Sequence, residues 1–355
     1  MAKEKTPICA SNAALNVVLV CAIISILRAG QNLFLPFVIA LFIWALIWLL
    51  DSAFDNMFAR LRASGLARWL SRPLSIITII GIFYFIIAGI RGNMDGIAEG
   101  FARYQSNLPA IMDRLGAHFG IDMSKYADVS ALVRGIDVPR LINKSLQGFA
   151  ALLSSMTMIV VYLVFMLMEE QSIKRKFPLA FKNSARVREA RQIVGKILAK
   201  IKAYLFTKTL TSIATGAVSY AIMKSVGLDF ALFWAILMFL CNYIPTLGSI
   251  VSSVFPIALS LIQFENTLVP FAVCAVGITA LQFLIGSIVE PRIMGKQINI
   301  SPLVLITSLV AWGYIWGVMG MFLCVPIMII LTIVLYNIPS TKRIAILMSE
   351  DGESV

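Results

Sequence analysis

Long apolar runs separated by polar connections dominate this sequence. Two of the apolar stretches, 230–262 and 302–335, are longer than one membrane crossing requires, and both are interrupted near the middle. A helix crosses the hydrocarbon core of a bilayer with about 20 apolar residues, and it satisfies its own backbone groups there. The pattern therefore predicts a helical protein that crosses a membrane several times. The uninterrupted runs are residues 13–27, 33–50, 74–90, 148–168, 205–223 and 267–289.

The composition agrees with a bilayer as the solvent. Hydrophobic residues make up 59% of the chain and charged residues only 14%, whereas about a quarter of the residues in soluble domains are charged. The sequence lacks strand-length blocks of alternating polarity, which argues against a membrane β-barrel. The predicted fold class is an all-α polytopic membrane protein with about eight membrane segments.

The formal net charge of +12 also has a membrane explanation. Lys and Arg accumulate in the cytoplasmic connections of membrane proteins. The basic connections 51–73 and 169–203 and the basic tail share one side if the N-terminus is cytoplasmic, and the more balanced segment 91–147 then lies outside. We expect both termini to lie in the cytoplasm. No nucleic-acid partner is predicted, because no nucleic-acid motif accompanies the charge.

The residue types that bind metals or perform covalent chemistry form no site pattern. The five cysteines lack the spacing of metal ligands, and the single histidine, His118, lies in a polar segment without an evident partner. The sequence contains no glycine-lysine phosphate loop and no nucleophile paired with a base. We predict no enzyme activity, no metal and no cofactor.

Charge and hydropathy divide the chain into successive parts. A scaffold of membrane spans comes first, and a core that contains both interrupted stretches lies near the C-terminus. The parts are scaffold 1–90, an extracytoplasmic segment of amphipathic helices 91–147, a span with a basic cytoplasmic helix 148–203, the core 204–340 and a cytoplasmic tail 341–355.

The basic helix has apolar residues at every third or fourth position from Val187 to Leu205, while Arg and Lys occupy the other face. Such a helix suits the anionic surface of the cytoplasmic leaflet. We therefore predict that residues 174–202 contact anionic lipids. The helix serves either as an interfacial connector or as an arm that moves with the following span.

The two interrupted stretches permit two topologies. If both are re-entrant hairpins, 230–262 enters from outside and 302–335 enters from inside, and each follows a membrane span. The result is an inverted repeat of the type found in secondary transporters. If each stretch forms two short spans, the charge pattern is satisfied equally well. Either topology buries the breaks inside protein, because lipid offers no hydrogen-bond partners.

The first break reads CNYIPTLGS, residues 241–249. Proline removes a backbone donor and breaks the helix, so the freed carbonyls and nearby polar side chains could bind a solute or a cation. The alternative is a turn that satisfies its own groups. The candidate binding or gating residues are Asn242, Tyr243, Pro245, Thr246 and Gly248.

A second polar group, EPRIMGKQINISPL, follows the run 267–289, and Lys208 lies just inside the run 205–223. A charge at membrane depth is costly and is usually functional or paired. At the interface, however, such charges can simply anchor a helix by snorkelling. The candidates are Lys208, Glu290, Pro291, Arg292, Gly295, Ser301 and Pro302.

The third group is AWGYIWGVMG, residues 311–320. Glycines permit close approach of two backbones, and the aromatic rings could stack on a ring-shaped solute. Tight packing with interfacial aromatics is the alternative. The candidates are Trp312, Gly313, Gly317, Gly320 and, further along, Pro326.

In FALFWAILMFLCNYIPTLGSIVSSVFP and IVEPRIMGKQINISPLVLITSLVAWGYIWGVMGMFLCVP the chain resembles the bacterial autoinducer-2 exporter family of permeases. The resemblance extends over nearly the whole chain. It implies the inverted repeat, a homo-oligomer with a pentamer expected, and export of autoinducer-2 or another small solute. The residues carried over by resemblance are Asn242, Pro245, Gly248, Glu290, Pro291, Arg292, Gly295, Ser301, Pro302, Gly313, Gly317, Gly320 and Pro326.

Three functions fit these features. A secondary exporter working by alternating access is favoured, because the first break is polar but mostly uncharged and so suits a compact polyol such as autoinducer-2. A sodium/proton antiporter needs a titratable group with alternating access, and Asp51 and Glu290 are the nearest acids. A non-transporting membrane scaffold is the third. The predicted transport motion moves the core, residues 205–335, against the first spans.

Overall fold

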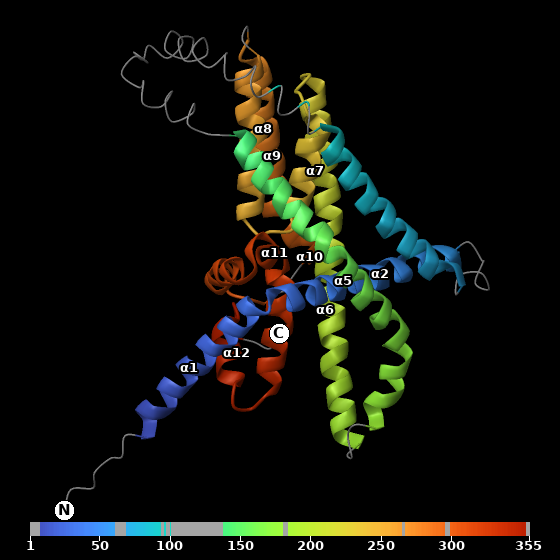
Figure 1. Ribbon diagram of the computed structural model, residues 1–355, viewed down its shortest axis with the longest axis vertical. Coiled ribbons are helices and arrows are strands. Elements are labelled where there is room, and N and C mark those ends of the chain that lie inside the picture. The colour runs from blue at the N-terminus through green and yellow to red at the C-terminus, as the bar shows by residue number, and fades with distance from the viewer. Residues whose placement is uncertain are drawn as a thin grey trace, which may run out of the picture.

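The structure is a computed structural model that describes residues 8–60, 69–93, 138–179, 184–264, 267–294 and 299–352, together with Gly96 and Gly100. Within these ranges the regular structure is helical and contains no strand (Figure 1). Five of the described helices are long and apolar enough to cross a membrane, which confirms the all-α polytopic class. They are Gln31–Arg60, Trp69–Asn93, Met156–Ile173, Val269–Met294 and Pro302–Asn337.

The first helices form a group around a shared apolar core. α1 (Ile8–Ala29) meets α2 (Gln31–Arg60) at Gly30. α2 packs against α5 (Val138–Leu179) and the helix Trp69–Asn93. The core residues are Ala40, Ile43, Ile47, Ile79 and Ile159.

Charged residues pair at one end of this group. The Arg72 guanidinium lies 3.2 Å from the Asp51 carboxylate and 2.8 Å from the Glu170 carboxylate. One cation therefore links α2, the helix Trp69–Asn93 and α5. The sequence indicates these charges only as members of polar connections, since it does not show that three helices bring them together.

α6 (Ser184–Ser225) is one continuous helix of 42 residues, about 63 Å long at 1.5 Å per residue. It contains both the predicted basic helix and the predicted span that begins at Leu205. No Pro or Gly lies between Lys196 and Thr215 to stop the helix. The predicted boundary between residues 203 and 204 therefore falls inside α6 rather than between two elements.

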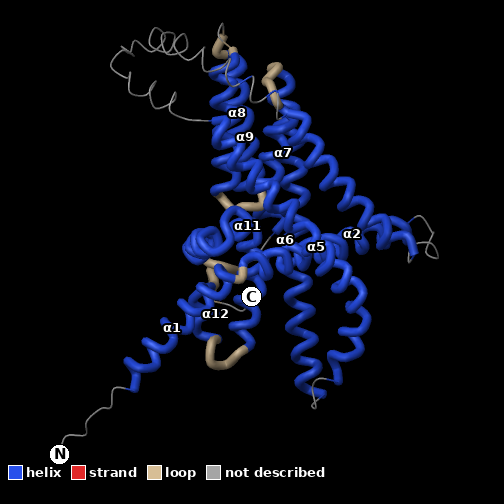
Figure 2. Tube along the Cα trace, in the orientation of Figure 1, coloured by secondary structure: helices blue, strands red, loops and turns tan. Residues whose placement is uncertain are grey.

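The first interrupted stretch is a helical hairpin. Its arms are α7 (Ala231–Cys241) and α8 (Leu247–Gln263), which pack against each other. At 1.5 Å per residue the arms are about 16 and 26 Å long, so neither spans a hydrocarbon core of about 30 Å by itself. The turn between them lies deep in the molecule, at the lower ends of both arms in Figure 2. Residues 230–262 therefore form two short antiparallel helices joined by a tight turn.

The second interrupted stretch also folds back on itself. α9 (Val269–Leu284) continues through a π-helical turn, η2 (Ile285–Val289), into α10 (Glu290–Met294). α11 (Pro302–Asn337) is broken at Gly317, whose φ of 64° and ψ of −146° are not helical. The short helix α12 (Lys342–Met348) then packs against α11.

The tips of the two hairpins share one steric feature. A Cβ added to Gly248 would lie 1.8 Å from the Cys241 carbonyl oxygen, and a Cβ added to Gly320 would lie 2.0 Å from the Trp312 carbonyl oxygen. Both contacts are far shorter than any side chain tolerates. Glycine is therefore required at each tip for the second arm to pass the end of the first.

The two hairpins meet through apolar side chains. Ile244 from the first turn packs with Leu309, Cys324 and Met328 of α11. The Tyr243 ring stacks on Phe322 with ring centroids 4.9 Å apart. Of segment 91–147, the structure describes only the two ends together with Gly96 and Gly100, so the amphipathic helices predicted there lie outside the described residues. The candidate Gly295 also lies outside them.

Candidate functional site

A polar face of α6 meets the tip of the first hairpin. Thr207, Thr211, Thr215 and Ser219 recur every four residues, a spacing that aligns side chains along one side of a helix. All four are at most 2% exposed. Thr211 and Thr215 donate to the carbonyls of the residues four positions earlier, at 3.0 and 2.8 Å. This row was not predicted, although its four-residue spacing inside an apolar run is visible in the sequence.

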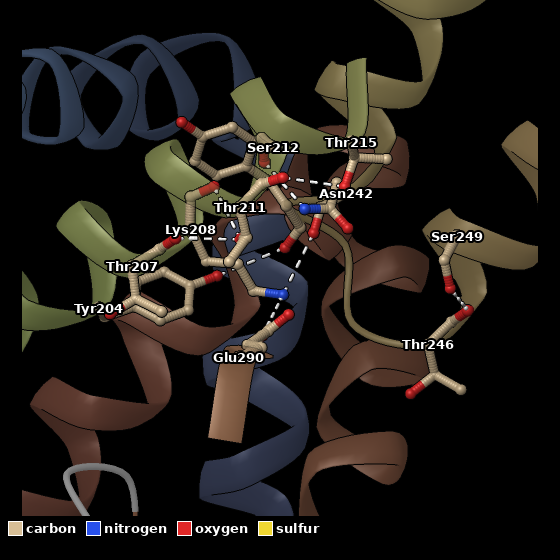
Figure 3. Close-up of polar contacts among 11 residues, drawn as sticks. Tyr204, Thr207, Lys208, Thr211, Ser212, Thr215, Asn242, Thr246, Ser249 and Glu290 are labelled. Carbon is tan, nitrogen blue, oxygen red and sulfur yellow. Dashed lines mark hydrogen bonds and ion pairs between the residues drawn. The ribbon is translucent and has the colours of Figure 1, made fainter. Parts of the chain in front are cut away.

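Lys208 on the same helix is the centre of the site. Its Nζ lies 2.5 Å from Oε1 of Glu290 and donates to the Asn242 carbonyl at 3.2 Å. The exposed fractions of the two charged side chains are 7% for Lys208 and 18% for Glu290. Figure 3 shows the Lys208 amine pointing toward both partners. Charges buried to this degree require a partner, and each supplies the other's.

The π-helical turn brings Glu290 to α6. A π turn holds more residues than an α turn, so it changes the direction of the side chains that follow. η2 ends at Val289, directly before Glu290, and α10 packs against α6. The sequence permits two interpretations of Glu290 and Arg292: functional charges at membrane depth, or a snorkelling pair that anchors the helix at the interface. In the structure Glu290 pairs with Lys208, whereas Pro291 and Arg292 are exposed.

The carbonyls freed at the end of α7 are bound by α6. Besides the Lys208 contact, the Tyr204 hydroxyl donates to the Tyr243 carbonyl at 3.3 Å. The Asn242 side-chain amide donates to Ser212 Oγ at 3.1 Å. The turn therefore does not satisfy all its hydrogen-bonding groups internally, and its carbonyls are not left free for a solute either. The buried polar side chains of α6 satisfy the turn from outside.

Two more contacts fix the hairpin on both sides. The hydroxyls of Thr209 and Tyr243 are 2.8 Å apart, which joins α6 to the turn. On the second arm, the Gln282 amide of α9 donates to Ser253 Oγ at 3.2 Å. The tip is thus held by hydrogen bonds between uncharged groups around a single ion pair.

The far side of the turn differs. Pro245 is half-buried and Thr246 is exposed. Thr246 has φ 59° and ψ −59°, and the Leu247 N–H donates to the Pro245 carbonyl at 2.6 Å. This is the strained γ-turn with positive φ, which is unfavourable for a β-branched residue. Figure 3 shows Thr246 and its partner Ser249 apart from the Lys208 group.

The third sequence group lies at the tip of the second hairpin and contacts α1. Trp316 Nε1 donates to the Leu27 carbonyl at 3.1 Å, and the Arg28 guanidinium lies 4.4 Å from the Tyr314 ring centroid. The Trp312 ring lies 5.1 Å from that of Trp316, between centroids. Among the glycines and the proline of this group, Gly313 is half-buried, Gly317 exposed, and Gly320 and Pro326 buried.

The residues at the start of α11 contact the end of α12 rather than the group around Lys208. The Ser301 N–H donates to the Met348 carbonyl at 2.9 Å, while Pro302 is exposed. The structure therefore brings together Lys208, Asn242, Tyr243 and Glu290 out of the predicted set. The other described candidates lie at the turn of the first hairpin, on the exposed side of α10, along α11 with the second tip, and at the contact with α12.

The chemistry of the Lys208 group is polar and electrically balanced. One lysine and one glutamate cancel in charge, and amide, hydroxyl and phenol groups surround them. Among the described residues no group of three His, Cys, Asp or Glu side chains is placed to hold a metal ion.

Comparison with known proteins gives a consistent assignment. The sequence model of a family described as AI-2E family transporter matches residues 14–340. A putative transport protein of Haemophilus influenzae is 26% identical, with 95% of both chains covered. The AI-2 transport protein TqsA of Escherichia coli is 28% identical over 94% of this chain and 93% of its own. A putative transport protein of Borreliella burgdorferi is 32% identical over 69% of this chain and 67% of its own.

Proposed function

The chain belongs to the AI-2E transporter family, and from this premise we propose that it is a secondary transporter that exports a small polar solute. We propose autoinducer-2 as that solute, since an Escherichia coli relative of nearly full coverage is an AI-2 transport protein. The protein acts without a cofactor and without enzymatic chemistry. We propose the bacterial inner membrane as its location, with both termini in the cytoplasm, and the distribution of Lys and Arg supports this orientation.

The observation that carries the proposal is the charge-balanced group around Lys208. A compact polyol needs donors and acceptors rather than a fixed net charge. Such groups pair between α6 and the hairpin turn, where the Asn242 amide donates to Ser212 and the Thr209 hydroxyl pairs with the Tyr243 hydroxyl. Moving the tip away from α6 would release these groups, so that a solute could take the place of the broken hydrogen bonds.

Alternating access then follows from the two hairpins. Each comes after a long helix, and each has a glycine that lets its arms pass closely, at Gly248 and at Gly320. These similarities support an inverted repeat, with the hairpins entering from opposite sides of the membrane. In this mechanism the core, residues 204–340, moves against the scaffold of the first helices. Several copies would share a membrane assembly, for which we propose the pentamer.

Flux measured with purified protein tests the proposal. Proteoliposomes containing the wild-type chain should release labelled autoinducer-2 faster than empty liposomes. Asn242→Ala should slow this release, because it removes the amide that binds Ser212. Asn337→Ala is the matched control, since Asn337 only donates to the Ile333 carbonyl within its own helix. Wild-type release no faster than that of empty liposomes would refute the assignment to autoinducer-2.

Sodium/proton exchange is the second candidate, and the position of Glu290 supports it. A coupled exchanger needs an acid that gains and loses a proton as it changes exposure. Glu290 is mostly buried against Lys208, so parting the pair would expose it. A sodium-driven pH change in proteoliposomes that is lost in Glu290→Gln, without autoinducer-2 release in the wild type, would favour this function.

A further inference from the structure

An open groove of about 520 Å³ lies between α2 and α6, outside the site described above. Gly195, Ala199 and Ala203 recur every four residues on α6. Because these residues are small, they leave room for a groove on that side of the helix. Trp48 of α2 lies across from them. The volume falls within the range of about 300–1,000 Å³ that is typical of sites for small ligands, and most of the lining is apolar.

The groove connects a basic region with an apolar one. Beyond its Gly195 end, α6 carries exposed Arg188 and Arg191, and exposed Lys196 directly follows Gly195. At the other end the groove reaches Phe206, which is exposed at the start of the predicted apolar run 205–223. A ligand that matches this gradient is anionic at one end and apolar along the rest.

Lys202 provides a positive charge on the wall of the groove. Its amine lies 4.9 Å from the centroid of the Trp48 ring and donates to Ser52 Oγ at 2.5 Å. Within the described part of the chain, no carboxylate forms an ion pair with Lys202. The hydroxyl and the ring face orient the amine but leave its charge without a counter-ion.

The neighbouring lysines show that positive charge accumulates here. Partial burial, together with repulsion from Lys196, lowers the pKa of Lys200. An anion bound at this surface would relieve the repulsion. Two copies of the chain packed groove to groove would instead add like charges at the basic end, which opposes self-association through this face.

We propose that this groove binds an anionic phospholipid. The phosphate is held by Lys196 and Lys202, and one acyl chain lies over Ala199 and Ala203 toward Phe206. The lipid thereby joins α2 of the scaffold to α6 of the core. The inference stands on the groove, its polarity and the uncompensated lysine, and it does not depend on which solute is transported.

Thermal unfolding of the full-length protein in detergent tests this site. Added phosphatidylglycerol should raise the midpoint of unfolding in a saturable manner, and phosphatidylcholine with the same acyl chains should have much less effect. Native mass spectrometry should show phosphatidylglycerol retained on the wild-type chain. Lys196→Gln combined with Lys202→Gln should lower the affinity for phosphatidylglycerol about tenfold, the equivalent of 1.4 kcal/mol.

A variant that fills the groove distinguishes binding of the lipid in the groove from general attraction of anionic lipid to a basic surface. Ala199→Trp keeps every charge but occupies the groove, so the shift specific to phosphatidylglycerol and the retained lipid should both be lost. Ala280→Trp is the matched control, because Ala280 is exposed on α9 away from the groove. Equal shifts with both lipids, or a shift that survives Ala199→Trp, would overturn the proposal. Disulfide-linked dimers of Ala199→Cys in liposomes would also overturn it, because they would assign the groove to contact between copies.

Discussion

The Lys208 amine lies 2.5 Å from the Glu290 carboxylate and also binds the Asn242 carbonyl, so one side chain joins α6, α10 and the first hairpin. These partners are far apart in the sequence and meet at the end of α7, where the chain breaks. Because the ion pair is mostly buried, it connects the stability of the core to the position of the hairpin tip.

Removing one partner of this pair should be more harmful than removing both charges. Lys208→Met or Glu290→Gln leaves an uncompensated charge, and breaking a buried pair costs about 3–5 kcal/mol. Lys208→Met combined with Glu290→Gln leaves no isolated charge, so we expect it to recover much of the lost stability. Unfolding midpoints in detergent should rank the double variant above both single variants. A double variant less stable than both single variants would contradict it.

The glycines at the two tips should not tolerate a methyl group. Gly248→Ala and Gly320→Ala place a Cβ against a backbone carbonyl, and overpacking of this kind costs about 1–3 kcal/mol or more. Gly286→Ala is the control, since an added Cβ there meets nothing within 4 Å. Unfolding midpoints should fall for the two tip variants and stay near wild type for the control. Equal midpoints for all three would argue against the close passage of the arms.

A substitution in the γ-turn at Thr246 should instead raise the unfolding midpoint. Glycine adopts a positive φ without strain, so Thr246→Gly should relieve a cost of about 1–3 kcal/mol and raise the unfolding midpoint. The exposed position means that little packing is lost. If the strain helps the tip to move, flux in proteoliposomes will decrease as stability increases. Thr307→Gly, inside α11 and also exposed, should be destabilising instead.

The contact between α1 and the second tip should restrain that tip. Trp316→Phe keeps an aromatic ring but removes the hydrogen bond to the Leu27 carbonyl, a loss of about 0.5–1.5 kcal/mol. Hydrogen exchange around Gly317 should become faster. Trp69→Phe is the control, because Trp69 is 84% exposed and lies on another helix. Unchanged exchange in Trp316→Phe would show that α1 does not hold the tip.

The sequence predicted the helical class and the positions of the breaks because these depend on local composition. Runs of apolar residues mark the helices in lipid, and Pro245 and Gly317 mark where the chain cannot continue as one helix. Asn242 and Glu290 were likewise visible as polar residues in an apolar context. The four-residue spacing of the Thr and Ser row on α6 was also visible in the sequence. Only the packing of the hairpin turn against α6 shows which part of the molecule this row faces.

The folding back of each interrupted stretch on itself was decided by tertiary packing. Charge counting does not show how the two arms pack, whereas the approach of Gly248 to the Cys241 carbonyl shows that they fold back on each other. The partner of Glu290 was also undetermined by the sequence. Arg292 is two residues away, but the π-helical turn and the packing of α10 on α6 place Lys208 beside Glu290. Local sequence determines where a helix is polar or broken, and only the three-dimensional packing decides which distant group satisfies it.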